Sequence, residues 1–334
     1  MKKNFFILVM VVLLFGVVFS GCVSDANSKV GAENQETLKI GVIVYPGFAP
    51  FFIADEKNFF EKEGVNAEVV MINDPAQAIS VLASNNVQLL FSSADFTPII
   101  VDAGVDVKEI FASDIGYGSD GLLVKDDVNS ILDLKGKTVY LAPGMPSNFL
   151  FRYLAKEQGL SKDDITIVPM DVDQVGVAFV SGQIDYGMSW EPWLSKASER
   201  KDGKLLLSSK DKPGIITDTF VVRSDVLQSR REGVKKVVRA WFDSLDFMKS
   251  NSIEANEIMA KNLGLPVEDF AVQLETVKFL DYADNLKKFD KANALNLFEL
   301  SDKAVEIYRE DEVISSNPNP ETFVDPSILA ELYK

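Results

Sequence analysis

Histidine is absent from the 334 residues of the chain, and cysteine occurs only once, at Cys22. Without histidine, no imidazole is available as a general base, a nucleophile or a metal ligand. A single cysteine also excludes a disulfide bond within the chain. These two absences remove many of the common catalytic and metal-binding arrangements.

Basic side chains are scarce, with 34 lysines and arginines against 50 aspartates and glutamates and a formal net charge of −16. Such a surface repels the phosphate backbone, so we expect no nucleic-acid partner. No segment resembles a nucleophile elbow, a phosphate-binding glycine loop or a set of metal ligands. We predict that the protein is not an enzyme and has no catalytic residue, metal or cofactor. A cleft enzyme with paired carboxylates stays open as an alternative.

Long apolar runs are missing after the first 22 residues. Lys2 and Lys3 precede an apolar run over residues 5–19, and small residues connect this run to Cys22. A basic head, an apolar run too short to span a bilayer and a small-residue exit are typical of a secretory signal. The pattern resembles a lipoprotein signal, which predicts a signal peptide at residues 1–21 and lipidation of Cys22. An ordinary signal peptide is the alternative.

Small and polar residues fill the segment 22–36, which follows the signal. Such a composition does not bury a core, so we interpret the segment as a flexible tether. The roughly 300 residues after it are enough for two lobes with a core each. We expect an extracytoplasmic protein, in the periplasm or on the cell surface, that a lipid anchor at Cys22 holds to the membrane.

Two stretches of the chain follow one plan of strand, helix, strand, helix and strand. The predicted strands are 39–45, 67–72 and 88–92 in the first stretch, and 137–142, 165–170 and 184–188 in the second. Helices are predicted to begin near Pro50 and Ser147, and at the N-caps Asp74 and Asp171. Corresponding residues recur at a nearly constant offset, which indicates an internal repeat: Gly47 with Gly144, Gly64 with Gly159, and Gln77 with Gln174.

The predicted strands are apolar almost throughout, as strands buried in parallel sheets are. Strands that alternate with helices form an open sheet covered on both faces, so the predicted fold class is α/β with two doubly wound lobes. Ligands of such sheets bind beyond the carboxyl ends of the strands. The loops 45–50, 92–97, 143–148 and 190–193 should therefore line a cleft between the lobes.

Two further strands, 121–125 and 218–223, flank the second repeat and are predicted to form the two crossings between the lobes. This assigns residues 37–124 and 219–334 to lobe 1 and residues 125–218 to lobe 2. From Ser229 onward, apolar residues recur at helical spacing. We expect these helices to pack back on lobe 1, with their aromatic residues in the core.

Several short motifs resemble those of one family of binding proteins in their order and spacing. They are the segments 45–50, 59–64, 134–137, 182–185 and above all 190–193. Residues 38–325 resemble the nitrate/sulfonate/taurine and thiamine-pyrimidine (NMT1/THI5-like) group of ABC-transporter solute-binding lipoproteins. The resemblance implies a type II periplasmic-binding-protein fold, a monomer that closes around one solute, and an ABC permease with its ATPase as partners. A related enzyme branch consumes an active-site histidine, which this chain lacks.

Two helix starts face the predicted cleft, at residues 48–51 and 147–149. A helix start presents unpaired backbone N–H groups and a partial positive charge, which favour an anion. Phe48 and Ala49 would lie at the first start, and Ser147 and Asn148 would add donors at the second. The alternative is that Ser147 only caps its own helix.

Three acidic residues fall in the predicted cleft loops: Asp95, Glu191 and Asp218. If they converge, they would hold an ammonium, amidine-like or aminopyrimidine group. Asp95 and Glu191 could instead cap the helices that follow them, and Asp218 could fix a turn. A cation or a flat ring would also stack on the aromatic side chains in or beside these loops, which are Tyr45, Phe48, Phe96, Tyr117, Trp190 and Trp193. Trp193 could instead be buried beneath its helix.

The resemblance implies a solute-binding protein of an ABC importer, and the candidate residues are consistent with a solute site in its cleft. The expected solute is small and amine-bearing or zwitterionic, either taurine- or sulfonate-like or an aminopyrimidine. One alternative is a simple anion such as nitrate, bicarbonate or an alkanesulfonate. The others are a cleft enzyme and an extracellular sensor domain.

Overall fold

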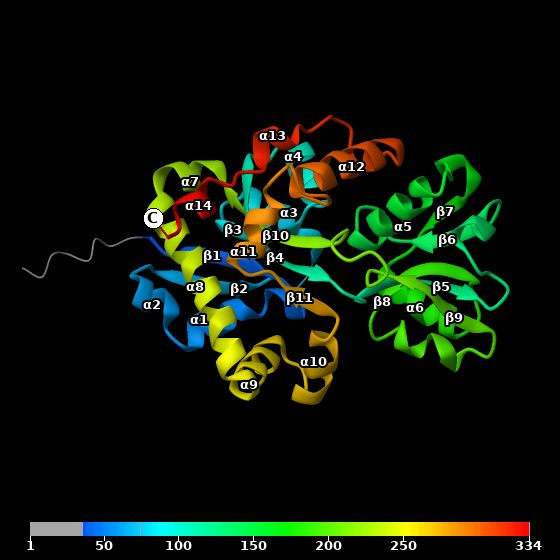
Figure 1. The fold of residues 1–334 in the computed structure, drawn as a ribbon, viewed down its shortest axis with the longest axis horizontal. Coiled ribbons are helices and arrows are strands. Elements are labelled where there is room, and N and C mark those ends of the chain that lie inside the picture. The colour runs from blue at the N-terminus through cyan, green and yellow to red at the C-terminus, as the bar shows by residue number, and fades with distance from the viewer. Residues whose placement is uncertain (1–35, 74, 334) are drawn as a thin grey trace, which may run out of the picture. The chain divides into compact units, whose positions relative to one another are not determined.

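The computed structural model describes residues 36–73 and 75–333 (Figure 1). The predicted signal peptide, Cys22, nearly all of the tether and the predicted N-cap Asp74 lie outside the described residues. The chain from Glu36 onward forms one compact unit. Among the described helices, none combines the length and apolarity needed to cross a membrane.

The larger sheet has six strands in the order β11-β4-β10-β3-β1-β2. Strand β1 pairs in parallel with β2 and β3, whereas β10 is antiparallel to both β3 and β4. The strands are β1 (Leu38–Val42), β2 (Ala67–Met71), β3 (Leu89–Ser93), β4 (Val107–Gly116), β10 (Thr217–Arg223) and β11 (Val277–Phe279).

The second sheet has five strands in the order β7-β6-β8-β5-β9. Strand β6 is parallel to β7 and β8, and β5 is antiparallel to β8 and β9. The strands are β5 (Asp120–Lys125), β6 (Thr138–Leu141), β7 (Thr166–Pro169), β8 (Tyr186–Trp190) and β9 (Gly203–Ser208).

The predicted repeat is confirmed by the strand order of the two sheets. In each, the first strand of the repeat lies between the second and the third, and an antiparallel strand follows the third. All six predicted repeat strands are present, with small differences at their ends. The predicted α/β class is therefore confirmed, and equivalent loops leave both sheets at the carboxyl ends of the parallel strands.

The helices between these strands begin and end near the predicted residues. The first predicted helix is divided, because Asn58 adopts a left-handed conformation (φ 57°) between its two parts. Asp171 caps its helix as predicted, since its side chain accepts hydrogen bonds from two backbone N–H groups of the first turn. The helices are α1 (Pro50–Glu56), α2 (Phe59–Glu63), α3 (Ala78–Ala83), α4 (Thr97–Asp102), α5 (Pro146–Glu157) and α6 (Val172–Val180).

Three strands, β4, β9 and β11, were not predicted, and the first two change the description of the connections between the sheets. Strand β11 interrupts the region after Ser229, which was predicted as helices. The chain passes between the sheets from β4 to β5 and returns from β9 to β10, beside the strands that were predicted as crossings. Strand β5 belongs to the second sheet, although the predicted lobe 1 extends to residue 124. The division into two lobes with these limits stays a prediction, because the chain from Glu36 onward is one compact unit.

The C-terminal helices cover the larger sheet with aromatic side chains, as predicted. Trp241 is fully buried and its ring centroid lies 4.8 Å from that of Phe51 and 5.4 Å from that of Phe111. Burial of each such ring stabilises the fold by about 2–3 kcal/mol. These helices are α7 (Ser224–Ser229), α8 (Arg231–Ser250), α9 (Ser252–Leu263), α10 (Val267–Leu274), α11 (Tyr282–Lys288), α12 (Leu297–Glu310), α13 (Pro320–Phe323) and α14 (Ser327–Glu331).

Candidate functional site: a buried carboxyl cluster

Strand pairing brings polar side chains together at one edge of the larger sheet. Asp218, at the start of β10, lies directly opposite Ser93 in β3 and Asp114 in β4. Residues directly opposite in antiparallel strands have Cβ atoms about 5 Å apart, with both side chains on the same face. This edge lies at the carboxyl ends of β1 and β3, where the fold class predicts a ligand.

Asp114 and Asp218 share a hydrogen bond between their carboxyl groups. Asp114 also accepts hydrogen bonds from the Tyr45 hydroxyl at 3.1 Å and the Ser113 hydroxyl at 2.8 Å. Burial raises the pKa of Asp114 to about 6. Burial, followed by the charge of Asp114, raises the pKa of Asp218 well above its usual range. Asp218 therefore keeps its proton to higher pH and donates it to Asp114.

Two more buried aspartates lie near this pair. Asp95, in the loop after β3, accepts hydrogen bonds from Ser93 at 2.8 Å and from the Tyr308 hydroxyl at 2.7 Å, and burial raises its pKa. Asp120, the first residue of β5 in the second sheet, accepts a hydrogen bond from Ser119 at 2.8 Å. Burial, and then the charge of Asp95, raises the pKa of Asp120 to about 6. We refer to Asp95, Asp114, Asp120 and Asp218 as the carboxyl cluster.

The negative charge of the carboxyl cluster has no basic counterpart. Within the described part of the chain, none of the four aspartates forms an ion pair with a lysine or arginine. Instead, the charges of Asp95, Asp114 and Asp120 all raise the pKa of Asp218. Buried carboxylates without a cation are unfavourable, so the cluster is suited to receive positive charge from outside the chain.

A further buried acid lies beside the cluster on β4. One oxygen of Glu109 accepts hydrogen bonds from Thr97 at 2.9 Å and Thr219 at 2.7 Å, and the other has no partner among the described residues. Burial raises the pKa of Glu109 to about 7. The described residues contain no group of three or more acidic or cysteine side chains that could hold a metal ion.

The predicted site residues of the larger sheet fall into two groups. Tyr45, Asp95 and Asp218 take part in the carboxyl cluster. Phe48 and Ala49 are buried, and Phe48 packs on Phe91 and Phe220 with ring centroids 5.4 and 5.5 Å away, so these two side chains belong to the core beneath the cluster. Two other aromatic residues remain half-buried beside it: Phe96, which stacks on Phe91, and Tyr117.

The start of α5 lies close to the cluster. The Tyr308 hydroxyl, which donates to Asp95, also lies 3.3 Å from the carbonyl oxygen of Met145, the N-cap of α5. Ser147 and Asn148 are both buried in the first turn, and the side-chain oxygen of Asn148 has no partner among the described residues. Ser147 lies inside the helix and makes no capping hydrogen bond, so the capping alternative is wrong.

Glu191 and Trp190 follow a different pattern at the end of β8. The Glu191 carboxylate accepts hydrogen bonds from the backbone N–H and the hydroxyl of Ser195 at 3.1 and 2.9 Å. Ser195 begins the next short helix, whose N-cap is Leu194, so Glu191 stabilises this helix start without being its N-cap. Trp190 is half-buried, and its indole N–H donates to Asp173 at 2.7 Å. A role of these residues in ligand binding stays a prediction.

Three residues of the cluster environment were missed from the sequence: Asp114, Asp120 and Tyr308. Asp114 lies in β4, a strand that was not predicted. Tyr308 lies in a C-terminal helix, and the helical spacing predicted that this helix packs on lobe 1 but not which of its side chains reach the cluster. One signal was available, because the polar pair Ser113-Asp114 ends the apolar run 110–112. A buried polar pair at the end of an apolar strand is typical of a ligand-binding edge.

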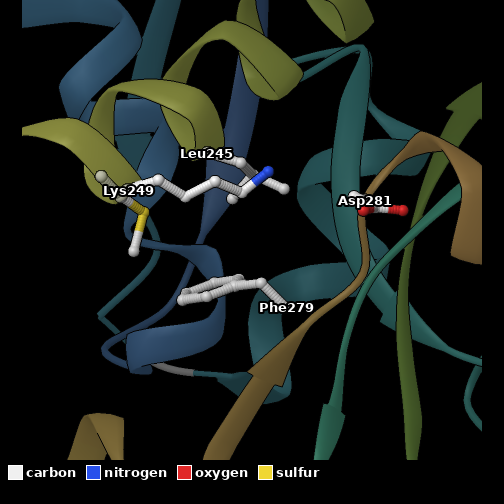
Figure 2. Close-up of a pocket in the computed structure, with 5 residues that line it drawn as sticks. Leu245, Lys249, Phe279 and Asp281 are labelled. Atoms are coloured by element: carbon white, nitrogen blue, oxygen red, sulfur yellow. The ribbon is translucent and has the colours of Figure 1, made fainter.

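Two surface cavities are lined by residues outside the carboxyl cluster. Figure 2 shows the first, of about 300 Å³, where Phe279 forms one wall and Lys249 and Asp281 lie on different sides; Leu245 and Met248 complete its lining. The second, of about 340 Å³, is lined by residues that include Asp106 and Arg223. Neither is lined by a residue of the carboxyl cluster, so these cavities are distinct from the candidate site.

Two repeated α/β sheets, with a polar site that draws residues from both, are the arrangement of the periplasmic-binding-protein fold. The model of the family described as NMT1/THI5 like matches residues 45–255, more than half of the chain, and the chain belongs to this family. The expected type II periplasmic-binding-protein fold and the family resemblance are confirmed.

Solved structures share the fold. The periplasmic aliphatic sulphonate binding protein SsuA from Escherichia coli has a TM-score of 0.70 at 18% identity, covering 89% of this chain and 99% of that one. The periplasmic nitrate-binding protein NrtA from Synechocystis PCC 6803 has a TM-score of 0.57 at 16% identity, with coverages of 89% and 98%. At these identities the likeness establishes the fold alone.

Relatives in sequence carry related names. The taurine-binding periplasmic protein of Escherichia coli (strain K12) is 27% identical over 220 residues, which cover 64% of this chain and 67% of that protein. A protein of Bacillus subtilis (strain 168), named provisionally as an aliphatic sulfonates-binding protein, is 29% identical over 266 residues and 77% of each chain.

Proposed function

We propose that the protein captures a small amine-bearing or zwitterionic solute outside the cytoplasm and delivers it to an ABC permease and its ATPase. The observation that supports this most is the carboxyl cluster, which combines four buried aspartates with no ion-paired lysine or arginine in the described residues. The family and the fold support the transport role.

An ammonium or aminopyrimidine group would satisfy the cluster in two ways. Its positive charge would favour the ionised forms of Asp114 and Asp120, whose pKa values burial raises to about 6. Its N–H groups would donate to the carboxylate oxygens, and hydrogen bonds to charged groups contribute about 1.5–3 kcal/mol each. Taurine, for which one relative is named, carries an ammonium group together with a sulfonate.

A simple anion is the second candidate solute. It is favoured by the start of α5, where Ser147 and Asn148 are buried. This helix start lies near Asp95, because the Tyr308 hydroxyl contacts both of them. Relatives in structure named for aliphatic sulphonate and nitrate point the same way. A zwitterion would place its anionic group at this helix start and its amine at the cluster.

The location of the protein is part of the proposal. A lipid at Cys22 would hold the chain to the membrane as a monomer, with the segment 22–36 as a tether. The support is the basic, apolar and small-residue pattern of residues 1–22 and the periplasmic location in the names of relatives. Labelling of cells with a radioactive fatty acid would test it, since wild type should incorporate the label and Cys22→Ala should not.

A thermal-shift panel of matched solutes tests the proposed solute class. The chain from residue 29 is unfolded and refolded to remove carried-over solute, then mixed with taurine, ethanesulfonate, nitrate, bicarbonate, an aminopyrimidine or the pyrimidine without its amino group. A solute at ~100 times its Kd adds about 2.7 kcal/mol to the free energy of unfolding. We expect shifts only with the amine-bearing member of each pair.

The same panel separates the alternatives. Asp114→Asn should abolish the shift, whereas Asp163→Asn, an exposed control on the second lobe, should keep it. Equal shifts with taurine and ethanesulfonate, or a shift with nitrate alone, would discard the amine-binding site and keep the transport role. Formation of a product from any solute would favour an enzyme instead.

A further inference from the structure

Two tryptophans of the second sheet converge on one carboxylate oxygen. The indole N–H groups of Trp190 and Trp193 both donate to Oδ1 of Asp173, at 2.7 and 3.0 Å. Asp173 lies in the first turn of α6, beside strand β8 that ends at Trp190 (Figure 1). One side chain therefore fixes the edges of two large aromatic rings.

Strand register places one of these rings beside the carboxyl cluster. Trp190 lies directly opposite Asp120 in the antiparallel pair of β8 and β5. Directly opposed residues project their side chains from the same face of a sheet, about 5 Å apart at Cβ. Trp190 is only half-buried, whereas Asp120 is buried and interacts electrostatically with Asp95.

The second ring, that of Trp193, packs closely against helix α6. A Cβ atom on Gly176 of α6 would lie 2.1 Å from Cγ of Trp193, so only glycine allows the indole to pack there. The ammonium of Lys196 lies 4.9 Å from the centroid of the Trp193 ring. The face of the Trp193 ring thus already binds a cation, the Lys196 ammonium, by a cation–π interaction.

We infer that Asp173 is a positioning residue that orients Trp190, so that its ring and the Asp120 carboxylate together bind the cationic group of the solute. This inference rests on the proposed function and narrows its solute class. An aromatic face favours a weakly hydrated organic cation, such as an alkylated ammonium or a protonated flat heterocycle, over a bare ammonium. The carboxylate alone makes no such distinction.

The unliganded protein gives the first test, because tryptophan fluorescence reports directly on the rings. The chain has three tryptophans, and the third, Trp241, is fully buried in the core on the larger sheet. A Trp241→Phe variant therefore retains only the emission of Trp190 and Trp193. In that background, Asp173→Ala should shift the emission and increase quenching by acrylamide. Asp173→Asn, which keeps one acceptor oxygen, should have a smaller effect, and Asp163→Ala should have none.

Choline and its uncharged carbon isostere, 3,3-dimethylbutan-1-ol, give the second test, with ethanolamine as the primary amine. Fluorescence titration of the wild type should show binding in the order choline, ethanolamine, isostere. Asp173→Ala should weaken choline about tenfold and ethanolamine much less, since one cation–π contact in a desolvated site is of this size. The circular dichroism spectra of the variants should match that of the wild type.

The outcomes separate this inference from the proposed function. Binding of ethanolamine or taurine with no preference for choline, or choline binding that Asp173→Ala leaves unchanged, contradicts the positioning role alone. Equal binding of choline and its isostere contradicts cation recognition by the ring. If no amine binds the wild type, the proposed function and this inference both fail.

Discussion

At the scale of single residues, Asp114 experiences two opposing effects. Burial favours its neutral form, whereas hydrogen bonds from Ser113 and Asp218 favour its anion, and the pKa settles at about 6. At neutral pH the carboxyl group is therefore mostly ionised, and it forms no ion pair with a lysine or arginine of the described residues. If the solute is a cation, as proposed, its binding would remove this unfavourable state. Tight solute binding and a lower stability of the solute-free protein would then have the same cause.

The substitution Asp114→Asn should separate these two effects. It should stabilise the solute-free protein by about 1–3 kcal/mol at pH 7.5, because it removes a buried charge and keeps an acceptor for Tyr45 and Asp218. It should also weaken binding of an amine-bearing solute at least tenfold. Urea unfolding and calorimetric titration measure the two quantities, and Asp163→Asn serves as the exposed control. A destabilised variant with unchanged affinity would contradict the assignment.

A second prediction at this scale concerns the space beside Asp114. A Cβ atom on Gly47 would lie 2.3 Å from a ring carbon of Tyr45 and 2.4 Å from a carboxylate oxygen of Asp114. Gly47→Ala should therefore displace both side chains, destabilise the fold by about 1–3 kcal/mol and abolish solute binding.

Gly233 in α8 provides the matched control for Gly47→Ala. A Cβ atom there would meet methyl groups of Leu38 at 3.2 Å and of Val65 at 3.8 Å, the second of which is an ordinary contact. Gly233→Ala should leave binding intact and change stability by no more than about 1 kcal/mol, because alanine also favours the helix. If both variants bind solute as the wild type does, close packing around Asp114 is unimportant for the site.

Sequence reasoning found some residues of the candidate site and missed others for a physical reason. Tyr45, Asp95 and Asp218 lie at ends of predicted strands, and the fold class alone directs such residues to the cleft. Tyr308 reaches Asp95 across 213 positions of the chain, through the packing of α12. No local pattern encodes a contact of that kind.

At the scale of elements, ion pairs join α5, which follows the first strand of the second sheet's repeat, to α12 in the C-terminal region. We call this group of ion pairs the seam. Arg152 of α5 is fully buried and its Nε lies 3.0 Å from the carboxylate of Asp311, directly after α12. Lys156, one turn on, contacts Glu306 and Glu310 at 2.8 and 2.6 Å. Since Tyr308 of α12 also links Asp95 to the start of α5, the seam fixes the helix start relative to the carboxyl cluster.

Removal of the buried cation of this seam should be costly. Arg152→Ala leaves Asp311 without its partner, and breaking a buried ion pair on one side destabilises proteins by about 3–5 kcal/mol. Because Asp311 retains some exposure, we expect about 2–4 kcal/mol in urea unfolding, with weaker solute binding. Lys303→Ala removes an exposed pair with Glu306 and should change stability by less than about 1 kcal/mol. Equal effects of the two variants would show that the seam is not structural.

The order of the elements was largely predictable, whereas their interruptions were not. The repeat of strands and helices follows from apolar patterning and from glycines that end helices, such as Gly64 with φ 69°. The break at Asn58 depends on one residue in a left-handed conformation, which many sequences tolerate without adopting. Strand β4 was missed because its polar end, Ser113-Asp114, interrupts the apolar pattern that indicates a buried strand.

At the scale of the whole molecule, buried acids should control how stability depends on pH. Burial raises the pKa of Asp114 and Asp120 to about 6 and that of Glu109 to about 7, whereas the unfolded values are 3.8 and 4.5. Between about pH 4 and 7 the folded protein therefore binds more protons than the unfolded chain. The free energy of unfolding falls as the pH rises through this window. Acids with lowered pKa values, such as Asp164 at about 2, lose their contribution only below it.

Solute binding should depend on pH in the opposite direction. The solute-free protein should be more stable to urea at pH 5 than at pH 7.5, while affinity for an amine-bearing solute should rise over the same range as the carboxyl cluster ionises. Glu109→Gln should flatten the stability profile and leave the affinity profile in place. A solute-free stability that rises from pH 5 to 7.5 would contradict the burial of ionisable carboxyls.

The most direct measurement is to let the protein select its own solute. Solute-stripped wild type and Asp114→Asn are equilibrated with a small-molecule extract of cells, washed, denatured and analysed by mass spectrometry for released compounds. We predict that the wild type enriches one or a few amine-bearing compounds and that Asp114→Asn does not. Enrichment of compounds without an amine, to the same extent by both proteins, would contradict the carboxyl cluster as the binding site.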